Sequence, residues 1–230
     1  MKKYKKYMNN TKLYESSLSY SLKDAYNLIH TMEPAKFNES VDISIRLKLN
    51  SKTQPIRSDL VLPNGNGKKI RVLLLIENGD NNDELRAKYK IDKIGGSILI
   101  KDILDKKINL IYDYIITTPK MFPQLKPIAK ILGPKKLMPT IKNGTVTENI
   151  EKTLNSIYKG RISIRSNKYG VINLSMGRFS FTYKQIYDNF TSLYNNIIKI
   201  KDSNQKSIQI KNISISTTMS PGIKISLNKF

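Results

Sequence analysis

The amino-acid sequence predicts an α/β fold in which an α+β domain, built from both ends of the chain, carries an inserted three-layer, Rossmann-like α/β domain. Strands that alternate apolar and polar residues occur near both ends, whereas continuously apolar strands alternate with helices in the middle. We therefore expect residues 1–66 and 159–230 to form one discontinuous domain and residues 67–158 to form the insert. The two crossings, near residues 63–68 and 158–160, would act as a hinge. A single continuous domain is the alternative.

The first part of the chain is predicted to contain one helix and two strands. Apolar residues recur at helical spacing over residues 21–32, where Ser21 and Asp24 are a suitable N-terminal capping pair. Residues 41–49 alternate strictly between apolar and polar side chains, which indicates a strand with one buried face. A second, short strand is expected at residues 59–62.

The middle block is predicted to alternate strands with helices. Residues 70–76 are apolar apart from Arg71, which is typical of a strand buried on both faces of a parallel sheet. Further strands are expected at residues 91–96 and 112–117. Helices are expected at residues 81–90, 98–107, 119–131 and 149–158. Pro123 and Pro127 interrupt the third of these helices.

The last part of the chain returns to alternating strands. Strands are expected at residues 161–165, 170–174, 207–217 and 223–227, and a long amphipathic helix is expected at residues 183–200. The first two strands flank the polar segment 166–169, and this pattern predicts a hairpin. In the third strand the alternation slips between Ile210 and Ile213, which indicates a β-bulge.

The composition favours an anionic partner. The 230 residues include 40 Lys and Arg against 18 Asp and Glu, a formal net charge of +22, and 39% hydrophobic residues provide for packed cores. Nucleic acid is the leading partner, because neutralised phosphates release counterions. A membrane surface is the alternative, although no segment approaches the roughly 20 apolar residues of a membrane span. The basic residues 1–7 are expected to be a flexible extension.

Several classes of chemical site are excluded. The chain has no cysteine and one histidine, His30, so it offers no disulfide, no thiol nucleophile and no Cys/His zinc site, and we expect His30 to be a packing residue. The segment 65–68, Gly-Asn-Gly-Lys, lacks the first glycine and the final Ser or Thr of a phosphate loop, and a strand follows it. Asp80, Asp83 and Glu84 are more typical of the first turn of a helix than of a calcium loop. We expect no cofactor, no metal and no catalytic residue; the rival is a phosphate-processing enzyme that uses Asp80 or Asp83.

Three groups of loop residues are suited to RNA. Lys36 can meet a phosphate and Phe37 can stack on a base, and the alternative is that Phe37 is a core residue beside a solvated lysine. The segments 165–168 and 217–222 supply cations, hydroxyl groups that can read a ribose 2′-OH, and a glycine for close approach. All of them fall on the discontinuous domain, and we expect them to converge on one surface.

Residues 131–139, Ile-Leu-Gly-Pro-Lys-Lys-Leu-Met-Pro, are predicted to form an ordered loop. Gly133 and Pro134 break a helix, and Pro139 blocks another. Leu137 and Met138 are large and apolar, so we expect the loop to dock on its own domain. A plain surface turn is the alternative.

Three segments resemble motifs of the large-subunit ribosomal protein family that builds the mobile "L one" stalk. Residues 132–139 are similar to the family's Leu-Gly-Pro-Arg-Gly-Leu-Met-Pro, with Lys135 for the arginine and Lys136 for the second glycine. Residues 35–41 match its Ala-Lys-Phe-x-Glu-Ser/Thr-Val, and residues 62–68 resemble its Leu-Pro-His-Gly-x-Gly-Lys hinge.

Two further segments extend the resemblance over almost the whole chain. Residues 165–170 resemble Arg-Asn-Asp-Lys-x-Gly, with Ser166 and Asn167 as departures. Residues 216–219 are identical to the family's Ser/Thr-Thr-Thr-Met, and Ser220 replaces the glycine that follows.

The resemblance implies a non-catalytic structural constituent of the large ribosomal subunit that binds the stalk helix of the large-subunit rRNA through the discontinuous domain. It also implies that the insert faces the exit-site tRNA, that the stalk helps to move and release this tRNA, and that the protein can repress translation of its own mRNA. The protein would act as a monomer within the ribosome, away from membranes. Its frequent Lys, Asn, Ile and Tyr suggest a mitochondrion, a plastid or the cytoplasm of an AT-rich bacterium.

The residues expected to contact RNA are Lys36, Phe37, Ser40, Arg165, Ser166, Asn167, Lys168, Thr217, Thr218, Met219, Ser220 and Gly222. The expected hinge residues are Pro63, Gly65, Gly67 and Gly160. The signature loop consists of Gly133, Pro134, Lys135, Lys136, Leu137, Met138 and Pro139. A general nucleic-acid-binding or chaperone-like protein is a further rival, and it would show strong salt dependence with little preference among RNAs.

Overall fold

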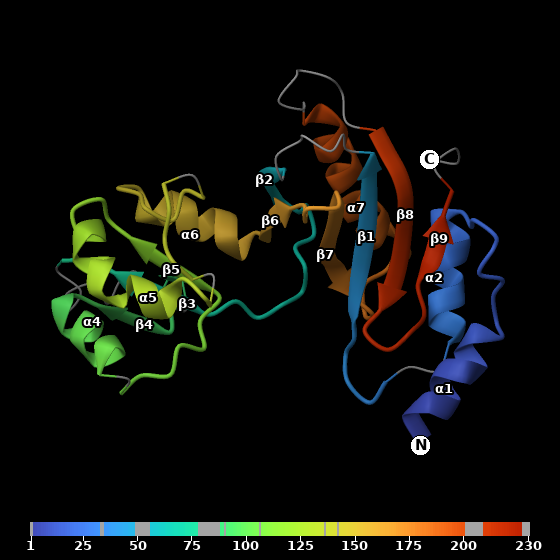
Figure 1. Ribbon diagram of the computed structural model, residues 1–230, viewed down its shortest axis with the longest axis horizontal. Helices are drawn as coiled ribbons and strands as arrows, with labels where there is room; N and C mark the ends of the chain where they lie inside the picture. Colours follow the sequence, from blue (N-terminus) through green and yellow to red (C-terminus); the bar gives the residue numbers. More distant parts are fainter. Residues whose placement is uncertain are drawn as a thin grey trace. The chain divides into compact units, whose positions relative to one another are not determined.

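The computed structural model describes residues 2–32, 35–48, 56–77, 88–89, 91–105, 107–135, 137–141, 143–200 and 209–226 (Figure 1). The chain forms two compact units: unit 1 is residues 1–68 with 159–230, and unit 2 is residues 69–158. Both units pack helices on sheets, so the predicted α/β class is confirmed. The first crossing falls after Lys68, two residues beyond the expected boundary.

Unit 1 is organised around a four-stranded antiparallel sheet in the order β7-β1-β8-β9. Its strands are β1 (Ser40–Lys48), β7 (Val171–Arg178), β8 (Gln209–Thr217) and β9 (Ile223–Ile225). β1 has the predicted alternation: its buried residues are Val41, Ile43, Ile45 and Leu47. Leu49, the last residue of the predicted strand, lies outside the described residues.

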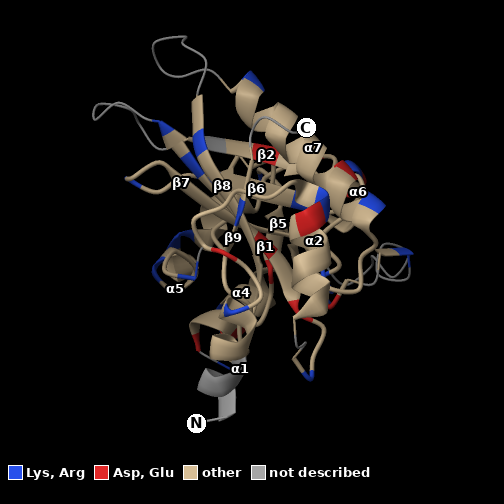
Figure 2. Ribbon diagram, turned by 90° about the vertical axis from the view of Figure 1, so that its right-hand side faces the viewer, with Lys and Arg blue, Asp and Glu red and all other residues tan. Residues whose placement is uncertain are grey.

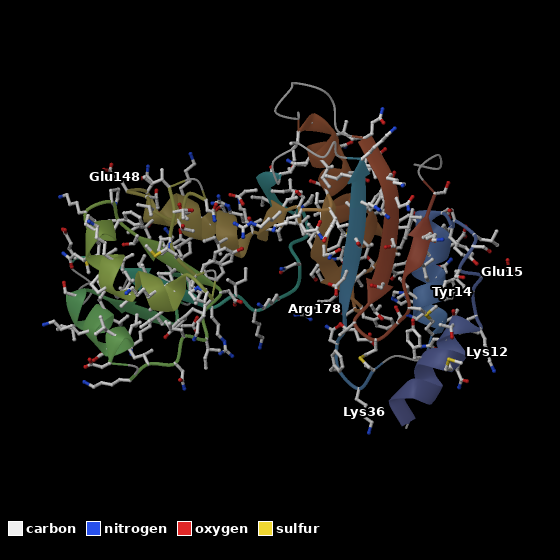
Figure 3. The ribbon with its side chains drawn as sticks, in the orientation of Figure 1. Lys12, Tyr14, Glu15, Lys36, Glu148 and Arg178 are labelled. Atoms are coloured by element: carbon white, nitrogen blue, oxygen red, sulfur yellow. The ribbon has the colours of Figure 1, made fainter. Side chains whose placement is uncertain are left out.

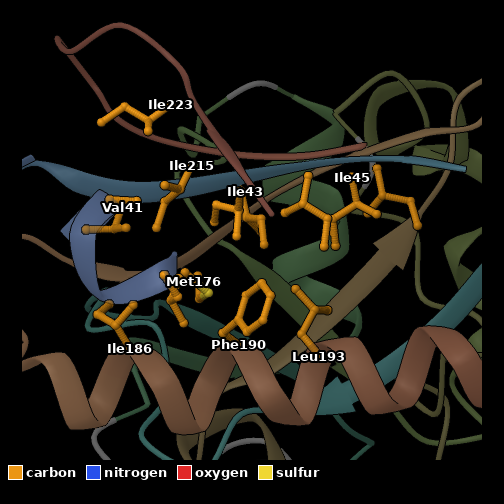
Figure 4. Close-up of a cluster of buried hydrophobic side chains, with 14 of the residues drawn as sticks. Val41, Ile43, Ile45, Met176, Ile186, Phe190, Leu193, Ile215 and Ile223 are labelled. Atoms are coloured by element: carbon orange, nitrogen blue, oxygen red, sulfur yellow. The ribbon is translucent and has the colours of Figure 1, made fainter. Parts of the chain in front are cut away.

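Two helices cover one face of this sheet, α2 (Leu22–Thr31) and α7 (Tyr183–Lys199). Ser21 caps α2 as predicted, because its hydroxyl oxygen accepts a hydrogen bond from the Asp24 N–H at 3.1 Å. The core between helices and sheet contains Ile43, Ile45, Met176, Phe190 and Leu193 (Figure 4). Removal of these apolar side chains from water stabilises the unit.

The predicted bulge is present in β8. Arg46 pairs with Asn212, whereas the next residue of β1, Leu47, pairs with Ile210. Lys211 is therefore the extra residue of the bulged strand. The break in the apolar alternation located it correctly.

The predicted hairpin at residues 166–169 is correct for the turn, where the Gly170 N–H donates to the Asn167 carbonyl at 3.1 Å, and wrong for the pairing of the two strands. β6 (Arg161–Arg165) pairs with β2 (Arg57–Val61) in a separate two-stranded sheet, whereas β7 pairs with β1. A single bridge, between Ser166 and Ile172, joins the two segments. Alternation of apolar and polar residues identifies strands, but it does not identify their partners. Here β6 and β7 each pair with a strand that is distant in the sequence.

The N-terminal residues form helix α1 (Lys2–Thr11), so the predicted flexible extension is wrong. Thr11 Oγ1 donates a hydrogen bond to the Met8 carbonyl oxygen at 2.8 Å and lies 3.1 Å from that of Tyr7, and so satisfies a carbonyl that the helix end leaves without a partner. Further on, Tyr20 forms a bridge with Ile225, which adds this segment to the edge of the sheet.

Unit 2 has three layers, as expected for the insert. Its parallel sheet has the order β4-β3-β5, with β3 (Val72–Leu75), β4 (Lys93–Gly95) and β5 (Tyr114–Thr117). Leu73 and Leu75 join a core with α4 (Ser97–Leu104), the 3-10 helix η2 (Phe122–Ile128) and α5 (Ala129–Leu132). Val72 and Leu74 join a second core with α6 (Ile150–Tyr158). Each face of the sheet therefore has its own core.

One predicted helix differs in type, and one is mostly outside the described part. The segment 119–131 is 3-10 over most of its helical length, because Pro127 lacks the N–H that an α-helix needs at that place. Of the helix predicted at residues 81–90, the structure describes Lys88 and Tyr89, and both are helical. The acidic cluster at residues 80–84 lies outside the described residues.

Candidate nucleic-acid interface

One end of the four-stranded sheet gathers several residues expected to contact RNA. Residues 35–39 lead into β1, and residues 218–222 leave β8 beside them, because the first residues of β1 pair with the last residues of β8. On the other side, Ser40 pairs with Arg178, the last residue of β7. Figure 3 shows Lys36 and Arg178 at this end of the strands. We call residues 35–40, 178 and 217–222 the loop end.

A buried carboxylate holds the loop end together. Glu39 is 2% exposed. Its Oε1 accepts a hydrogen bond from the Ala35 N–H at 2.7 Å, and its Oε2 accepts one from the Met219 N–H at 2.9 Å. Its backbone carbonyl accepts another from the Phe179 N–H at 2.8 Å. Because a buried carboxylate is costly unless it is hydrogen-bonded, these contacts fix both loops in one arrangement.

Hydroxyl groups add a second set of links at the same end. The Ser40 N–H donates to Thr218 Oγ1 at 3.1 Å, and the two hydroxyl oxygens lie 3.0 Å apart. Ser40 Oγ also donates to Asp42 Oδ2 at 3.1 Å. The Thr217 N–H donates to Ser220 Oγ at 2.8 Å, so the serine that replaces the family's glycine closes the turn after β8.

The exposed side chains of the loop end are those that could meet a ligand. Phe37 is 55% exposed and Met219 is 43% exposed, and Lys36 and Thr218 are exposed beside them. The alternative that Phe37 is a core residue is therefore excluded. Thr217, in contrast, is 6% exposed, because it lies on the inner face of β8.

The N-terminal segment reaches the same loop. Gly222 is exposed, and its carbonyl oxygen accepts a hydrogen bond from the Tyr14 hydroxyl at 3.5 Å. Partial burial raises the pKa of Tyr14 above its usual value, and the nearby Tyr7 and Tyr20 raise it further.

The second group of expected residues lies at the opposite end of β1. Residues 165–170, which we call the turn end, connect β6 to β7. Immediately after them, Val171 pairs with Arg46, six residues along β1 from Ser40. Six residues of strand span about 20 Å. The two groups therefore mark the two ends of one sheet, and their convergence on one surface stays a prediction.

Two polar side chains of the turn end stabilise the turn itself. Asn167 Oδ1 accepts hydrogen bonds from the Tyr169 N–H at 2.9 Å and the Val171 N–H at 2.8 Å. Ser166 is 3% exposed, and its Oγ accepts one from the Ile56 N–H at 2.8 Å. The exposed polar side chains of this turn are those of Arg165, Asn167 and Lys168.

Sequence reasoning missed three residues of the loop end. Glu39 and Asn38 lie within residues 35–41, the segment that resembles the family's motif. Their position in that segment could have identified them as candidates. Arg178 gave no such signal, because strand pairing alone brings it to Ser40. Its guanidinium donates to the Asn38 carbonyl at 3.4 Å, and its stem covers Gly67, where an added Cβ would lie 2.6 Å from Arg178 Cγ.

The first crossing segment, residues 63–68, is held to the body of unit 1 by Asn189. This residue of α7 is fully buried. Its Oδ1 accepts a hydrogen bond from the Asn64 N–H at 3.0 Å, and its Nδ2 donates to the carbonyl oxygens of Gly65 and Met176, both at 2.8 Å. One side chain therefore uses all of its hydrogen-bonding groups to join the crossing to α7 and β7.

The expected hinge residues include three glycines in the left-handed region. The φ angles are 63° at Gly65, 67° at Gly67 and 99° at Gly160. An added Cβ at Gly160 would lie 2.3 Å from the Cα of Gly65, so the two crossings touch through glycine. The Leu62 N–H donates to the Gly160 carbonyl at 3.1 Å, and Pro63 is exposed beside it.

The signature loop belongs to unit 2. Leu137 lies in its core, Met138 packs against that core, and the Leu137 N–H donates to the Leu132 carbonyl at 3.1 Å. The predicted docking of this loop on its own domain is confirmed. Its exposed residues are Gly133, Pro134 and Lys135, and its buried proline is Pro139. Lys136 lies outside the described residues.

Charge is distributed unevenly between the units. Unit 1 contains 24 Lys and Arg against 8 Asp and Glu, whereas unit 2 contains 16 against 10. Figure 2 colours the Lys and Arg residues of the ribbon blue and the Asp and Glu residues red. Among the described residues, no group of His, Asp and Glu could hold a metal ion. In the same part of the chain, no helix has the length and apolar character that a membrane crossing requires.

The single histidine has a packing role, as predicted. The His30 ring stacks on Phe179 with centroids 4.3 Å apart and lies against Tyr26 at 4.0 Å. Its Nδ1 is 2.9 Å from the Tyr26 carbonyl oxygen, and its Nε2 is 3.2 Å from the Phe179 carbonyl oxygen. The ring thus ties α2 to the segment that follows β7.

Fold and site together define an α/β protein in which a basic, discontinuous unit carries an inserted three-layer unit. The model of the ribosomal protein L1p/L10e family matches residues 29–221. The large ribosomal subunit protein uL1 of Ureaplasma parvum serovar 3 is 42% identical over 212 residues, which are 91% of each chain. Proteins of the same name from Phytoplasma australiense (36% over 227 residues, 98% of this chain and 97% of that protein) and Mesoplasma florum (38% over 233 residues, 99% and 100%) are also similar.

The chain belongs to the ribosomal protein L1p/L10e family, as the resemblance predicted. Proteins of this family are structural constituents of the ribosome and not enzymes, so the predicted absence of catalysis is confirmed. These relatives are bacterial, and they give no support to the expected mitochondrial or plastid source.

Proposed function

We propose that this protein is the large-subunit constituent that binds the stalk helix of the ribosomal RNA through unit 1. The observation that carries the proposal is the loop end. There Glu39 fixes two loops in a single arrangement, and that arrangement presents Lys36, Phe37, Thr218 and Met219 to solvent. A cation, an aromatic ring, a hydroxyl and an apolar side chain can together bind phosphate, base and ribose.

The excess of positive charge in unit 1 supports the same assignment. Its 24 basic and 8 acidic residues favour a polyanion, and the release of counterions from RNA would offset the mutual repulsion of these cations. Unit 2, with its smaller charge excess, would face the exit-site tRNA. The glycines at the crossings would let the stalk move as that tRNA is released.

The protein would act as a monomer within the ribosome of a bacterial cytoplasm, in agreement with the bacterial relatives. A segment of its own mRNA with a structure similar to the stalk helix would bind to the same loop end. Protein that is not bound to rRNA would therefore repress translation of this mRNA.

A salt-dependent titration tests the proposal. The full chain is titrated with the stalk segment of the large-subunit rRNA and with an unrelated duplex RNA of equal length. We expect a preference of at least about 100-fold for the stalk segment that persists at physiological salt, because specific contacts add to the electrostatic term. Equal affinities that fall together as salt rises would favour a general nucleic-acid-binding protein instead.

A further inference from the structure

The dipeptide Asn-Gly occurs four times in the sequence, at residues 64–65, 66–67, 78–79 and 143–144. An asparagine in this setting can lose ammonia, because the backbone nitrogen of the next residue can attack the side-chain carbonyl carbon, Cγ. Glycine permits this attack best, since it has no Cβ to hinder the approach. The second pair, Asn66 and Gly67, lies outside helices and strands in the first crossing segment. The third pair lies outside the described residues.

In the first and the last pair, the attacking nitrogen is engaged in a hydrogen bond. The Gly65 N–H donates to the Leu62 carbonyl oxygen at 3.2 Å, and the Gly144 N–H donates to the Ile141 carbonyl oxygen at 2.9 Å. Each hydrogen bond must break before the nitrogen can turn toward Cγ, so each one slows the attack. The fold therefore protects the asparagines of these two pairs.

Further contacts restrain the first pair. Asn64 Nδ2 donates to the Gln185 carbonyl oxygen at 3.4 Å, and the Asn64 N–H donates to Asn189 Oδ1 at 3.0 Å. Asn189 Nδ2 in turn donates to the Gly65 carbonyl oxygen at 2.8 Å. The first pair can reach the geometry of attack only when several of these contacts open together.

Asn66 and Gly67 have the opposite arrangement. Within the described residues the Gly67 N–H has no hydrogen-bond partner, and Gly67 is exposed to the water that must take up its proton. Asn66 Oδ1 accepts a hydrogen bond of 3.0 Å from the Lys68 N–H. This donor polarises the side-chain carbonyl and lies where negative charge develops on the oxygen during attack. The attacking nitrogen is therefore free and the attacked carbon is activated in the same pair.

We propose that Asn66 is a site of spontaneous deamidation, a covalent modification that goes beyond the proposed function. The Gly67 nitrogen gives its proton to water or hydroxide and forms a bond to Asn66 Cγ. The bond between Cγ and Nδ2 then breaks, so that ammonia leaves and a cyclic succinimide remains. One water molecule opens either carbonyl of this ring and yields aspartate or isoaspartate. The net reaction consumes one water and releases one ammonia.

Both products change the crossing segment. Each places a carboxylate next to Gly67, and isoaspartate also adds one carbon atom to the main chain. An added Cβ on Gly67 would lie 2.6 Å from Arg178 Cγ and 3.0 Å from Phe181 Cε1, so the segment has little room on that side. The lengthened chain must therefore move toward solvent, and the modification alters both the charge and the path of the crossing.

Peptide mapping of the aged full chain tests the proposal without any substitution. The folded protein is kept in mildly alkaline buffer, digested with trypsin and followed by mass spectrometry, in which each deamidation adds about 1 Da. Tryptic peptide 58–68 contains the first two Asn-Gly pairs, and electron-transfer fragmentation assigns the modified residue and identifies isoaspartate. We expect Asn66 to deamidate at least about tenfold faster than Asn64 and Asn143. A rate at Asn64 or Asn143 equal to that at Asn66 would overturn the proposal.

The same chain unfolded in guanidinium chloride is the control for sequence effects. Without the fold each glycine nitrogen is free, so we expect the rates at Asn64, Asn66 and Asn143 to lie within about threefold of one another. Folding should then slow Asn64 and Asn143 by about tenfold or more and leave Asn66 nearly as fast as in the unfolded chain. Slowing of Asn66 by the same factor as the other two would contradict the proposal.

Two variants of neighbouring pairs provide a second test. Asn66→Gln lengthens the side chain, so that attack would require a larger ring that forms far more slowly, and Asn64→Gln makes the same change at a protected pair. We expect peptide 58–68 of Asn66→Gln to keep its original mass, and that of Asn64→Gln to gain about 1 Da at the wild-type rate. The reverse result would show that Asn64 is the modified residue and would overturn the proposal. Urea unfolding checks that both variants remain folded.

Discussion

The carboxylate of Glu39 accepts a hydrogen bond of 2.9 Å from the backbone N–H of Met219, which is 180 residues away in the sequence. Its other oxygen accepts one from Ala35 in the loop before β1. A single buried side chain therefore joins the two loops that the sequence assigns to RNA binding. The arrangement of Phe37 and Met219 depends on a residue that need not touch RNA at all.

Glu39→Gln tests this dependence. The amide retains one acceptor oxygen and places an N–H₂ group against the second backbone donor, so one of the two loops loses its anchor. We expect the free energy of unfolding to fall by about 1–3 kcal/mol. We expect affinity for the stalk RNA to fall by about tenfold. Denaturation in urea and an RNA titration measure the two effects.

Glu15→Gln is the matched control, because Glu15 is exposed and its carboxylate has no partner within the described residues. It should leave stability within about 0.5 kcal/mol of the wild type. Wild-type RNA affinity in Glu39→Gln, with the stability loss present, would show that the loop end is not the RNA site.

Phe37→Ala separates binding from folding. Because Phe37 is 55% exposed, its removal should leave the free energy of unfolding within about 0.5 kcal/mol of the wild type. Loss of one aromatic stacking contact should weaken binding to the stalk RNA by about 1–3 kcal/mol. Tyr187→Ala, at an aromatic residue on α7 that is 39% exposed, should leave RNA affinity unchanged. Equal effects of both variants would remove Phe37 from the site.

Local patterns in the sequence predicted local structure well. The alternation over residues 41–49 predicted both β1 and its buried face, and the slip near Lys211 predicted the bulge. Leu137 and Met138 predicted that the signature loop would dock, because two large apolar side chains gain by leaving water.

Features that depend on long-range pairing were not predictable in the same way. β6 and β7 have the pattern of a hairpin, yet each finds a distant partner. Glu39, in a polar loop, has the appearance of a solvated charge until β8 brings Met219 beside it. The sequence also did not show that the loop end and the turn end lie at opposite ends of β1, because the positions of two loops depend on which strands pair.

Asn189→Asp tests the attachment of the crossing segment. The carboxylate keeps the acceptor for the Asn64 N–H but loses both donors, and it places negative charge against the carbonyl oxygens of Gly65 and Met176. We expect the free energy of unfolding to fall by about 3 kcal/mol or more, because several buried polar groups lose their partners. Asn195→Asp, an exposed change on the same helix, should have little effect. Similar stabilities of the two variants would mean that Asn189 does not hold the crossing.

Gly160→Ala tests the contact between the two crossings. The φ of 99° is a conformation that residues with a side chain rarely adopt, and the new Cβ would lie 2.3 Å from the Cα of Gly65. The backbone must therefore shift at both crossings together. We expect a loss of about 3 kcal/mol or more in the free energy of unfolding, measured by urea denaturation.

Gly222→Ala is the control for Gly160→Ala, because an added Cβ there meets no atom within 4 Å and the φ is not positive. Its stability should stay within about 0.5 kcal/mol of the wild type. A Gly160→Ala protein as stable as Gly222→Ala would show that the close approach of Gly160 to Gly65 does not require glycine. A large loss confined to Gly160→Ala would mean that the two crossings behave as one joint, so that any movement of unit 2 must begin from a fixed contact between Gly65 and Gly160.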